Sequence, residues 1–414
     1  TAMTQSENAL MPDSAFKAAG YDWRLFVGPQ VIEQNLAASV KRAGAARAFI
    51  ICSPSINQRT NTVRRIQSAL GDKFAGVYDG IAKDSTFASV QAAKQAAEDA
   101  GADMLIAVGG GSVLVAVRAV AIFMGESGDP FELMTQYPEG KSAFSPRLNA
   151  PKPPIINIPT TPTSAMNRAG TGLKNPDIAG RMEYFDPKTR PKAILLDDEV
   201  LLGAPMEVIR STATTVFAST LAGMAQTGLN PLVEGNRDQA FKLAHRAYIG
   251  LMHGLNDPDR RRDLALAAFL QNRAEDDGKG RFAGGVFAGD YAISTALHVI
   301  YPHIGQGEST SVVHAPAIRV ASAIPDDQAR QVASALGLWS VGMEAEDAAQ
   351  AVADRLDANY TEIGMPTRLR HLNVPKEDLH QVAAATLRNF NANAGVRSEV
   401  EQIASAMRLL EAAW

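Results

Sequence analysis

A regular alternation of short apolar runs with amphipathic stretches across residues 25–200 constrains this chain more than any other feature of its sequence. The apolar runs predict buried strands over residues 47–53, 74–78, 103–108, 154–159 and 193–197. The stretches between them predict helices over residues 30–44, 57–70, 87–99 and 111 to about 123. Strands that are apolar on both faces and are separated by helices form a parallel sheet covered on both sides. The first half of the chain is therefore expected to be an α/β domain.

The pattern after Pro205 predicts helices alone. They are expected over residues 206–227, 236–254, 260–272, 287–301, 315–323, 326–335, 345–363 and 377–393. A chain of 414 residues is long enough for two domains. We therefore expect an α/β domain over residues 1–204 and an all-α domain over residues 205–414. Residues 125–154 are rich in glycine, proline and polar side chains, and are expected to form a surface excursion of the first domain.

The charge balance and the cysteine content exclude several classes of partner and site. The net charge is −4, and aspartates surround the run 260–262 of three arginines, so neither nucleic acid nor an anionic membrane is expected as a partner. Cys52 is the single cysteine and lies in an apolar run, which excludes an internal disulfide and a thiolate zinc site. No apolar stretch is long enough to span a bilayer, and the polar N-terminus does not resemble a signal peptide. We therefore expect a cytoplasmic protein.

A glycine-rich turn follows the strand predicted at residues 103–108. The turn reads Gly109-Gly110-Gly111-Ser112, and a helix comes directly after it. Glycines let a backbone come close to a phosphate group, and the start of a helix offers free N–H groups to an anion. A tight strand-to-helix turn can also use glycines for purely structural reasons. Because an apolar strand enters this turn and a helix leaves it, we favour phosphate binding.

A second polar segment, residues 158–164, follows the next predicted strand. It carries hydroxyl groups on Thr160, Thr161 and Ser164. Parallel open sheets bind ligands beyond the carboxyl ends of their strands, where these hydroxyls are expected to lie. The alternative interpretation is that the hydroxyls only satisfy the backbone of their own loop.

Several motifs, taken in chain order, are similar to those of a known family. They are GGGS before a helix, IPTT after the next strand, AILLDDEVLLGAP at 193–205, STATTVFASTLAG at 211–223 and LHVIYPHIGQG at 297–307. From about Leu25 to the C-terminus, the chain resembles the iron-containing (group III) alcohol dehydrogenase superfamily. Ser53-Pro54 and Val115 stand where alcohol dehydrogenases usually carry an aspartate, and in this respect the chain is more similar to maleylacetate reductases.

This resemblance implies the fold shared with dehydroquinate synthases: a Rossmann-like N-terminal domain, a helical C-terminal domain, and an active site in the cleft between them. It implies NAD or NADP as cofactor, with the pyrophosphate at Gly109–Ser112. It also implies that Thr160, Thr161 and Ser164 face the cofactor. Ser53 replaces the acidic residue that holds the adenosine ribose in many relatives. An acid there repels a 2′-phosphate and a serine does not, so either dinucleotide is expected. The resemblance also implies a small-molecule substrate and a homodimer.

The metal site of the superfamily is altered in this chain. In the superfamily, one aspartate and three histidines hold the metal. At the corresponding positions the chain has Thr215, Ser219 and Val299, with His298 beside Val299, and His314 at the last one. Hydroxyls are poor ligands for a divalent transition metal, and a catalytic zinc usually has three protein ligands. A tightly bound iron or zinc is therefore not expected.

Three of the seven histidines, His298, His303 and His314, lie close together in the sequence. One interpretation is that they are core histidines satisfied by hydrogen bonds. We favour an active-site role for His303 and His298, because a histidine can donate a proton near neutral pH and can polarise a carbonyl. Asp290 could orient one of them, and Tyr301 is an alternative proton donor.

Functions from different classes remain open. We favour an NAD(P)-dependent oxidoreductase that transfers a hydride between nicotinamide and a carbonyl or alcohol. Within this class, the runner-up is reduction of a dicarboxylate, as in maleylacetate reductases, which would use basic groups such as Arg168, Arg273 or Arg281. A nucleotide-binding protein that has lost catalysis would also lack metal ligands. Lyase or cyclase chemistry, as in dehydroquinate synthases, is a further alternative, but their metal ligands are absent too.

Overall fold

The computed structural model describes residues 15–138, 141–278, 285–388 and 398–414, and within them the chain divides into two compact units. The α/β unit comprises Tyr21–Ala204 and Asp257–Ala265. The helical unit comprises residues 15–20, Pro205–Asn256 and Leu266–Trp414. No helix in the described part of the chain is long and apolar enough to cross a membrane.

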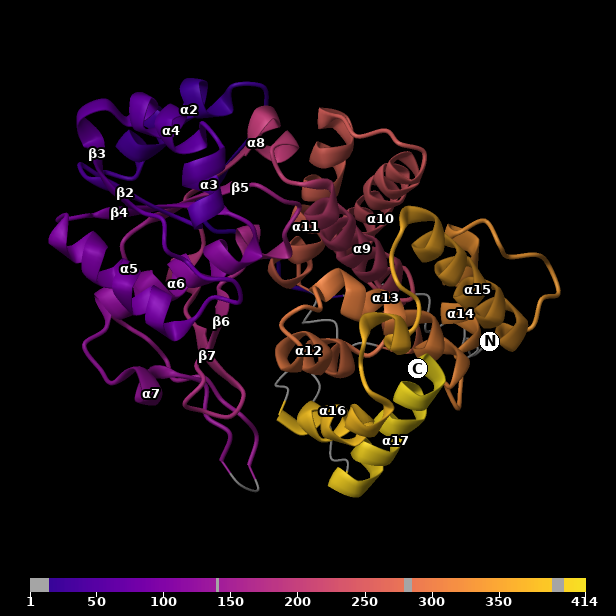
Figure 1. Cartoon of the computed structure of the whole chain (residues 1–414). Helices are drawn as coiled ribbons and strands as arrows, with labels where there is room; N and C mark the ends of the chain where they lie inside the picture. The colour runs from indigo at the N-terminus through magenta and orange to yellow at the C-terminus, as the bar shows by residue number, and fades with distance from the viewer. Residues whose placement is uncertain (1–14, 139–140, 279–284, 389–397) are drawn as a thin grey trace. The chain divides into compact units, whose positions relative to one another are not determined.

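A parallel sheet of six strands, in the order β1-β8-β5-β4-β2-β3, forms the centre of the α/β unit (Figure 1). Its strands are β1 (Arg24–Gly28), β2 (Ala48–Cys52), β3 (Phe74–Tyr78), β4 (Met104–Gly109), β5 (Ile155–Pro159) and β8 (Ala193–Asp197). The predicted apolar runs are thus confirmed as strands, and β2, β4, β5 and β8 are buried at every position. The sequence prediction missed β1, an edge strand whose residues Arg24 and Val27 are exposed and which therefore lacks a fully apolar pattern.

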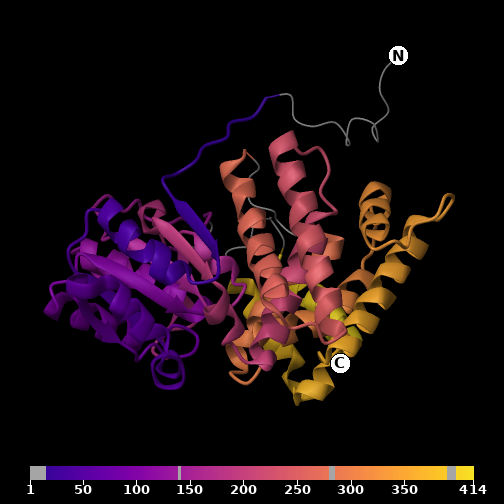
Figure 2. The same cartoon turned by 90° about the horizontal axis from the view of Figure 1, so that it is seen from above.

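Helices cover both faces of this sheet, with α2 and α4 on one face and α5 and α6 on the other (Figure 1; Figure 2 gives the view from above). They are α2 (Val31–Arg42), α3 (Pro54–Arg59), α4 (Thr62–Leu70), α5 (Phe87–Asp99), α6 (Gly111–Gly125) and α8 (Asp198–Leu202). The single helix predicted over residues 57–70 was wrong. Thr60 is extended there and its hydroxyl donates to the carbonyl of Ile56, so the chain forms α3 and α4 instead.

Two further elements of the α/β unit were not predicted. An antiparallel hairpin pairs β6 (Gly170–Lys174) with β7 (Arg181–Phe185). The expected excursion at residues 125–154 contains a short helix, α7 (Pro130–Leu133). The sequence of β6, GTGLK, carries two glycines, and β7, RMEYF, alternates between charged and apolar residues, so neither strand forms an apolar run.

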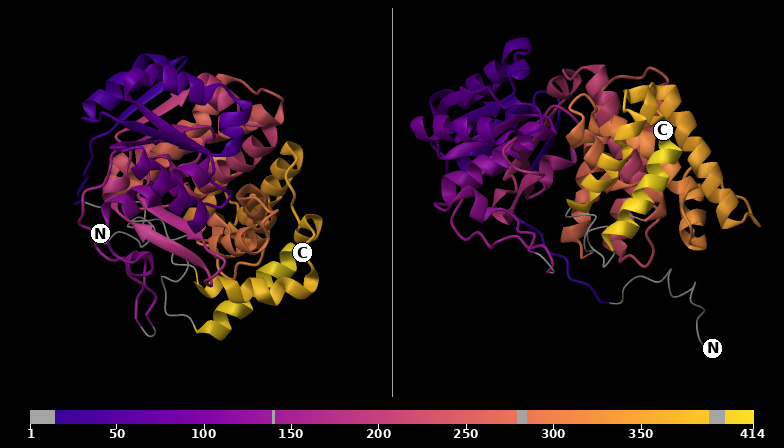
Figure 3. Two further views of the ribbon diagram at one scale, coloured as in Figure 1. Left: turned by 60° about the vertical axis from the view of Figure 1, so that its left-hand side comes forward. Right: turned by 60° about the horizontal axis from the view of Figure 1, so that its bottom comes forward.

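The helical unit contains no strand among its described residues, as predicted. Its helices are α9 (Met206–Gly223), α10 (Pro231–Met252), α11 (Pro258–Asp276, whose first turns belong to the α/β unit), α12 (Tyr291–Ile300), α13 (Gln306–Arg319), α14 (Asp326–Ala335), α15 (Ala345–Ile363), α16 (Leu379–Ala385) and α17 (Glu399–Ala413). Helix α13 packs against α9, α12 and α15, and α16 packs against α17 (Figure 3).

The ends of several predicted helices were wrong. Helix α13 begins at Gln306, nine residues before the predicted start at 315, although glycine, which weakens a helix, stands at its second residue, Gly307. Residues 286–288 form a separate 3-10 turn instead of the start of α12. Helix α16 is shorter than the predicted 377–393, whose last residues lie outside the described part, and α17 was missed.

Candidate active site and cofactor site

The glycine turn connects β4 to α6 in a space that side chains would fill. Gly109 has φ +159°, and a Cβ atom on it would lie 2.6 Å from the Val113 side chain. A Cβ on Gly110 would lie 3.3 Å from Oγ1 of Thr161, and one on Gly111 would lie 3.1 Å from Oγ1 of Thr163. Glycine at these positions therefore lets the turn approach the hydroxyl-bearing loop after β5.

Helix α6 begins at Gly111, within the glycine turn. The carbonyl of Gly110 accepts hydrogen bonds from the N–H groups of Val113 and Leu114 at 3.1 and 3.2 Å, which closes the first helical turn. The earlier N–H groups of any α-helix lack an acceptor within the helix, and the helix dipole adds partial positive charge there. A phosphate group fits this chemistry.

The hydroxyl-bearing loop lies directly beside the end of β4. The N–H of Thr160 donates to the carbonyl of Gly109 at 3.0 Å, and Oγ1 of Thr163 accepts from the N–H of Ala165 at 3.1 Å. Ser164 begins a 3-10 turn, Ser164–Asn167. The Thr161 side chain is 4% exposed, and its Oγ1 has no hydrogen-bond partner in the described part of the chain. A buried hydroxyl without a partner is costly, so a ligand atom beside Gly110 would satisfy it.

Arg118 anchors the far end of the same loop, and the sequence prediction gave it no role. Its side chain comes from α6 and is 2% exposed. Its Nε donates to the carbonyl of Gly170 at 2.8 Å, and its Nη1 donates to the carbonyl of Ala165 at 2.6 Å. Burial, together with the nearby charge of Arg168, lowers the pKa of Arg118 to about 9. A single charged residue in the apolar helix GSVLVAVRAVAIFMG was the signal that could have revealed this anchor.

Ser53 directly follows β2 and occupies the N-cap position of α3, where its side chain makes no capping hydrogen bond. Its Oγ lies 3.2 Å from Oγ of Ser55. Asp79 directly follows the neighbouring strand β3. Its carboxylate accepts a hydrogen bond from Nδ2 of Asn57 at 2.9 Å. Burial, with a smaller contribution from Asp79, raises the pKa of the Cys52 thiol to about 12, which disfavours the reactive thiolate.

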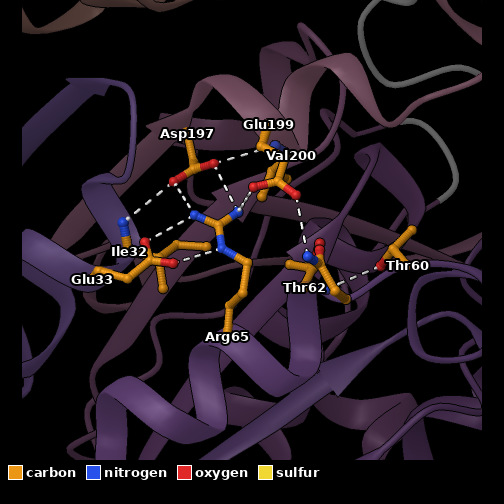
Figure 4. Close-up of polar contacts among 9 residues, drawn as sticks. Ile32, Glu33, Thr60, Thr62, Arg65, Asp197, Glu199 and Val200 are labelled. Carbon is orange, nitrogen blue, oxygen red and sulfur yellow. Dashed lines mark hydrogen bonds and ion pairs between the residues drawn. The ribbon is translucent and has the colours of Figure 1, made fainter.

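The motif AILLDDEVLLGAP has a structural role, which Figure 4 shows. Asp197 is buried at the end of β8, and its carboxylate accepts from the N–H of Val200 in α8 and from the N–H of Ile32 in α2. Arg65 from α4 pairs with Asp197 at 2.8 and 3.0 Å and with Glu33 at 2.7 and 2.9 Å. This side-chain hydrogen bond from Arg65 lowers the pKa of Glu33. The cluster fixes two helices to the end of the strand.

In the helical unit, Thr215 and Ser219 lie one turn apart on α9. The Thr215 hydroxyl donates to the carbonyls of Ser211 and Thr212 at 3.1 and 2.9 Å. The exposed Ser219 hydroxyl lies 3.3 Å from the carbonyl of Val216 and 3.0 Å from the side-chain oxygen of Gln271. Both hydroxyls therefore satisfy acceptors of the protein itself.

Helices α9 and α13 approach closely near these hydroxyls. A Cβ on Gly307 would lie 2.2 Å from the carbonyl of Ser211, so only glycine fits at this crossing. Oγ of Ser211 donates to the carboxylate of Glu308 at 2.9 Å and accepts from the N–H of Gly307 at 3.0 Å. Gly307 thus allows the two helices to pack closely.

His314 lies in α13 and is fully buried. Its Nε2 lies 2.8 Å from the carbonyl of Phe287 and must therefore donate, and its Nδ1 lies 2.6 Å from the hydroxyl of Tyr360, from which it accepts. Burial lowers the pKa of His314 to about 4. The assignment of His314 as a metal ligand stays a prediction. In this structure neither ring nitrogen of His314 is free. It is a hydrogen-bonded core histidine, the alternative that the sequence left open.

His303 and His298 differ from His314 in exposure. His303 is exposed, and its Nε2 donates to the carbonyl of Leu372 at 2.9 Å. His298 is half-buried at the end of α12, and its Nδ1 lies 2.9 Å from the carbonyl of Ile304. Each imidazole thus has one nitrogen fixed by a backbone carbonyl.

Two neighbours of these histidines have structural partners. Asp290 caps α12, because its carboxylate accepts from the N–H of Ile293 at 2.9 Å. The Tyr301 hydroxyl donates to Oδ2 of Asp378 at 2.7 Å, and burial together with this carboxylate raises the pKa of Tyr301. A tyrosine that already donates to a carboxylate is a poor proton donor to substrate.

Comparison with known proteins assigns the family. The family model described as "Iron-containing alcohol dehydrogenase" matches residues 24–198, and that described as "Fe-containing alcohol dehydrogenase family, C-terminal" matches residues 224–408. The chain belongs to the iron-containing alcohol dehydrogenase family. It is 25% identical to lactaldehyde reductase of Escherichia coli (strain K12) over 354 residues, 84% of this chain and 87% of that protein. It is 29% identical to maleylacetate reductase 2 of Cupriavidus pinatubonensis over 237 residues, 57% of each chain.

Solved structures share the fold. A 1,3-propanediol oxidoreductase superposes with a TM-score of 0.79 at 18% identity, covering 97% of this chain and 99% of that one. Maleylacetate reductase from Rhizobium sp. strain MTP-10005 gives 0.71 at 19% identity, with 97% and 98% covered. Sulfoacetaldehyde reductase from Bifidobacterium kashiwanohense, solved in complex with NAD⁺, gives 0.74 at 17% identity, with 96% and 99% covered. The predicted family and its fold class are confirmed.

The residues present do not fit the metal that gives the iron-containing alcohol dehydrogenase family its name. Among the residues that the structure describes, no three or more His, Cys, Asp or Glu side chains gather where they could hold a metal ion. At the family's ligand positions, Thr215 and Ser219 donate to protein acceptors, Val299 has no donor atom, and both nitrogens of His314 are engaged. We therefore derive no chemical step through a metal.

The three arginines considered for a carboxylate substrate have different surroundings. Arg168 is exposed in the loop after residues 164–167 of the α/β unit. Arg273 lies on α11 and pairs with Asp277, the residue after the end of that helix, at 3.3 Å. Arg281 lies outside the described residues.

Proposed function

We propose that this chain is an NAD(P)-dependent oxidoreductase that moves a hydride between nicotinamide and the carbonyl or alcohol carbon of a small molecule. The observation that carries this proposal is the glycine turn at the start of α6, which faces the buried hydroxyl of Thr161, a group without a partner among the described residues. Membership of an oxidoreductase family and the NAD⁺ complex of a relative with the same fold support it.

The residues around the turn fit a dinucleotide. We infer that the N–H groups at Gly111 and Ser112 bind the pyrophosphate, and that Thr160, Thr161 and Ser164 line its nicotinamide side. When bound, the reduced nicotinamide supplies the hydride. Ser53 at the end of β2 places no carboxylate against a 2′-phosphate, so both NAD and NADP remain candidates.

We propose His303 as the group that protonates the developing alkoxide. Because Nε2 donates a hydrogen bond to the carbonyl of Leu372, we propose Nδ1 as the nitrogen that faces the substrate oxygen. His298 is the second candidate. A hydrogen bond from an imidazolium would stabilise negative charge on the substrate oxygen without a metal.

A substrate that carries a carboxylate is a second candidate. Arg168 is exposed on the loop that follows the hydroxyls, and its charge is close enough to Arg118 to lower the pKa of that residue. Several maleylacetate reductases are relatives. We expect Arg168→Gln to raise KM for keto acids while leaving KM for uncharged aldehydes unchanged. Equal effects on both substrate classes would contradict this role.

Titration with NADH and NADPH tests the main proposal. Gly110→Val should abolish binding, because its Cβ already meets Thr161 and the larger side chain fills the turn. Gly235→Val is the matched control, since a Cβ there meets nothing within 4 Å. Unchanged affinity in Gly110→Val would place the cofactor elsewhere. Tight binding without turnover of any aldehyde, ketone or keto acid would favour a nucleotide-binding protein that has lost catalysis.

The oligomeric state remains a proposal. We propose a homodimer, as the family resemblance implies, and sedimentation equilibrium would test it. A monomer at micromolar concentration would contradict it.

A further inference from the structure

The loop between β3 and α5 contains two adjacent residues in the left-handed backbone region. Asp84 has φ +67° and Ser85 has φ +52°. In the described part of the chain, the other non-glycine residues with positive φ are Gln30 and Asn373, each of which stands alone. A side chain makes this conformation unfavourable, and serine lacks the tolerance of asparagine or aspartate for it. We call Asp84 and Ser85 the strap.

The strap is bonded to Ser112 in the first turn of α6. The Ser85 side chain is 2% exposed, and its hydroxyl donates to the carbonyl of Ser112. The N–H of Asp84 donates to Oγ of Ser112 at 3.3 Å. From the other side, the N–H of Lys174 in β6 donates to the carbonyl of Ser85 at 3.2 Å. The left-handed conformation thus directs two donors of the strap toward one serine.

These bonds determine what the Ser112 hydroxyl can do. A hydroxyl has one proton to donate and two lone pairs to accept with. Because the Asp84 N–H occupies a lone pair, the proton of Ser112 must point away from the strap. The start of α6 is the place where an anion would bind. The buried hydroxyl of Thr161 beside Gly110 has no partner in the part of the chain that the structure describes, and it independently indicates that a polar ligand belongs there.

We propose that the strap is a positioning element of the pyrophosphate site: it orients the Ser112 hydroxyl as a donor to a phosphate oxygen and holds the first turn of α6 ready for the anion. This inference rests on the proposed binding of NAD(P) at the glycine turn. Strained backbone persists where the surrounding structure over-determines it, and it gathers at ligand sites. In this protein, the bonds to Ser112 and Lys174 fix the strained conformation.

The test compares Ser85→Gly, which relieves the backbone and removes the hydroxyl, with Ser85→Ala, which removes the hydroxyl alone. Dissociation constants for NADH and NADPH are measured by fluorescence titration, together with kcat at saturating cofactor. Loss of one hydrogen bond of ordinary strength predicts a Kd about 2- to 10-fold higher for Ser85→Ala, and a smaller rise for Ser85→Gly, because glycine adopts the left-handed conformation without strain. The value of kcat should stay within about twofold, because the strap acts on binding.

Gln30→Gly is the matched control. It relieves a residue with φ +55° in the same unit, at the start of α2. Its effect on cofactor affinity should be nil. If Ser85→Gly does not fold, Ser85→Ala alone carries the test.

A double-mutant cycle with Ser112→Ala decides whether the strap acts through Ser112. Loss of a hydrogen bond to a charged phosphate should raise Kd about 10- to 100-fold, and Ser112→Thr should restore most of it. In the Ser112→Ala background, Ser85→Ala should add less than about twofold. Full additivity, or an unchanged Kd in both Ser85 variants, would overturn the role of the strap. If Gly110→Val also leaves Kd unchanged, the proposed cofactor site itself has failed, which is a distinguishable result.

Discussion

Replacing His314 by glutamine should remove a defined part of the acid sensitivity of this protein. In the folded chain, His314 is neutral, because Nε2 donates to the Phe287 carbonyl and Nδ1 accepts from Tyr360. Burial lowers its pKa from 6.5 to about 4. Between these pH values the unfolded chain holds a proton on this imidazole and the folded chain does not. Protonation therefore favours unfolding.

The magnitude follows from the size of the shift. The stabilisation is fully present above pH 6.5 and is lost as the pH falls toward about 4. One pKa unit corresponds to about 1.4 kcal/mol, so His314 accounts for about 3 kcal/mol across this window. Glutamine does not ionise, and its amide can still donate to the Phe287 carbonyl.

The assay is urea denaturation of wild type and His314→Gln at several pH values. At pH 7.5 the wild type should be the more stable protein, because glutamine cannot reproduce both hydrogen bonds. The advantage of the wild type should shrink by about 2–3 kcal/mol between pH 7.5 and 4.5. His303→Gln is the control, because that histidine is exposed. A difference between wild type and His314→Gln that stays constant with pH would refute the reasoning.

Other substitutions give equally direct predictions. Arg118→Met removes the donors to one buried and one partly buried carbonyl. It should lower the free energy of unfolding by about 2–4 kcal/mol and weaken cofactor binding, as urea denaturation and titration would show. Asp197→Asn should lower the free energy of unfolding by about 3–5 kcal/mol, because it breaks the buried ion pair with Arg65. Glu33→Gln changes a half-exposed carboxylate and should lower it by about 1 kcal/mol or less in the same assay. His303→Ala should lower kcat about 10²- to 10⁴-fold, and kcat close to wild type would exclude it as the proton donor. Elemental analysis of protein purified without chelator should find no stoichiometric iron or zinc, and metal lost together with activity on chelation would contradict this.

The sheet could be predicted because burial on both faces leaves a simple pattern in the sequence. Strands β2, β4, β5 and β8 are apolar at nearly every position. The edge strand β1 and the hairpin β6–β7 contain exposed residues or glycines and therefore lack a continuous apolar pattern. Their pairing depends on strands that the local sequence does not reveal. Helix α13 shows a different error. The predicted helix began only at residue 315, but the helix already includes Gly307, where only glycine fits against the backbone of Ser211.

The candidate site could be predicted only in part. The glycine turn and the hydroxyls after β5 follow from their places at strand ends. The partners of His314 could not be foreseen, because Phe287 and Tyr360 lie far from it in the sequence, and burial by distant segments decides the state of an imidazole. Arg118 left a visible signal, a charge in an apolar helix. The strap left no such signal, because the residue types Asp84 and Ser85 do not by themselves determine a left-handed backbone.

The substitutions at the metal positions are consistent with one another in physical terms. A carboxylate left in place of Thr215 without a cation would be an unpaired charge in a partly buried site, which is costly. Threonine instead donates to the carbonyls of its own helix, and Ser219 lies against Gln271. These hydroxyls are already committed to protein acceptors, so they are not free donors for a developing alkoxide. In the function that we propose, an imidazole stabilises that charge. The exposed His303 engages Nε2 with the carbonyl of Leu372, whereas both ring nitrogens of the buried His314 are engaged within the protein.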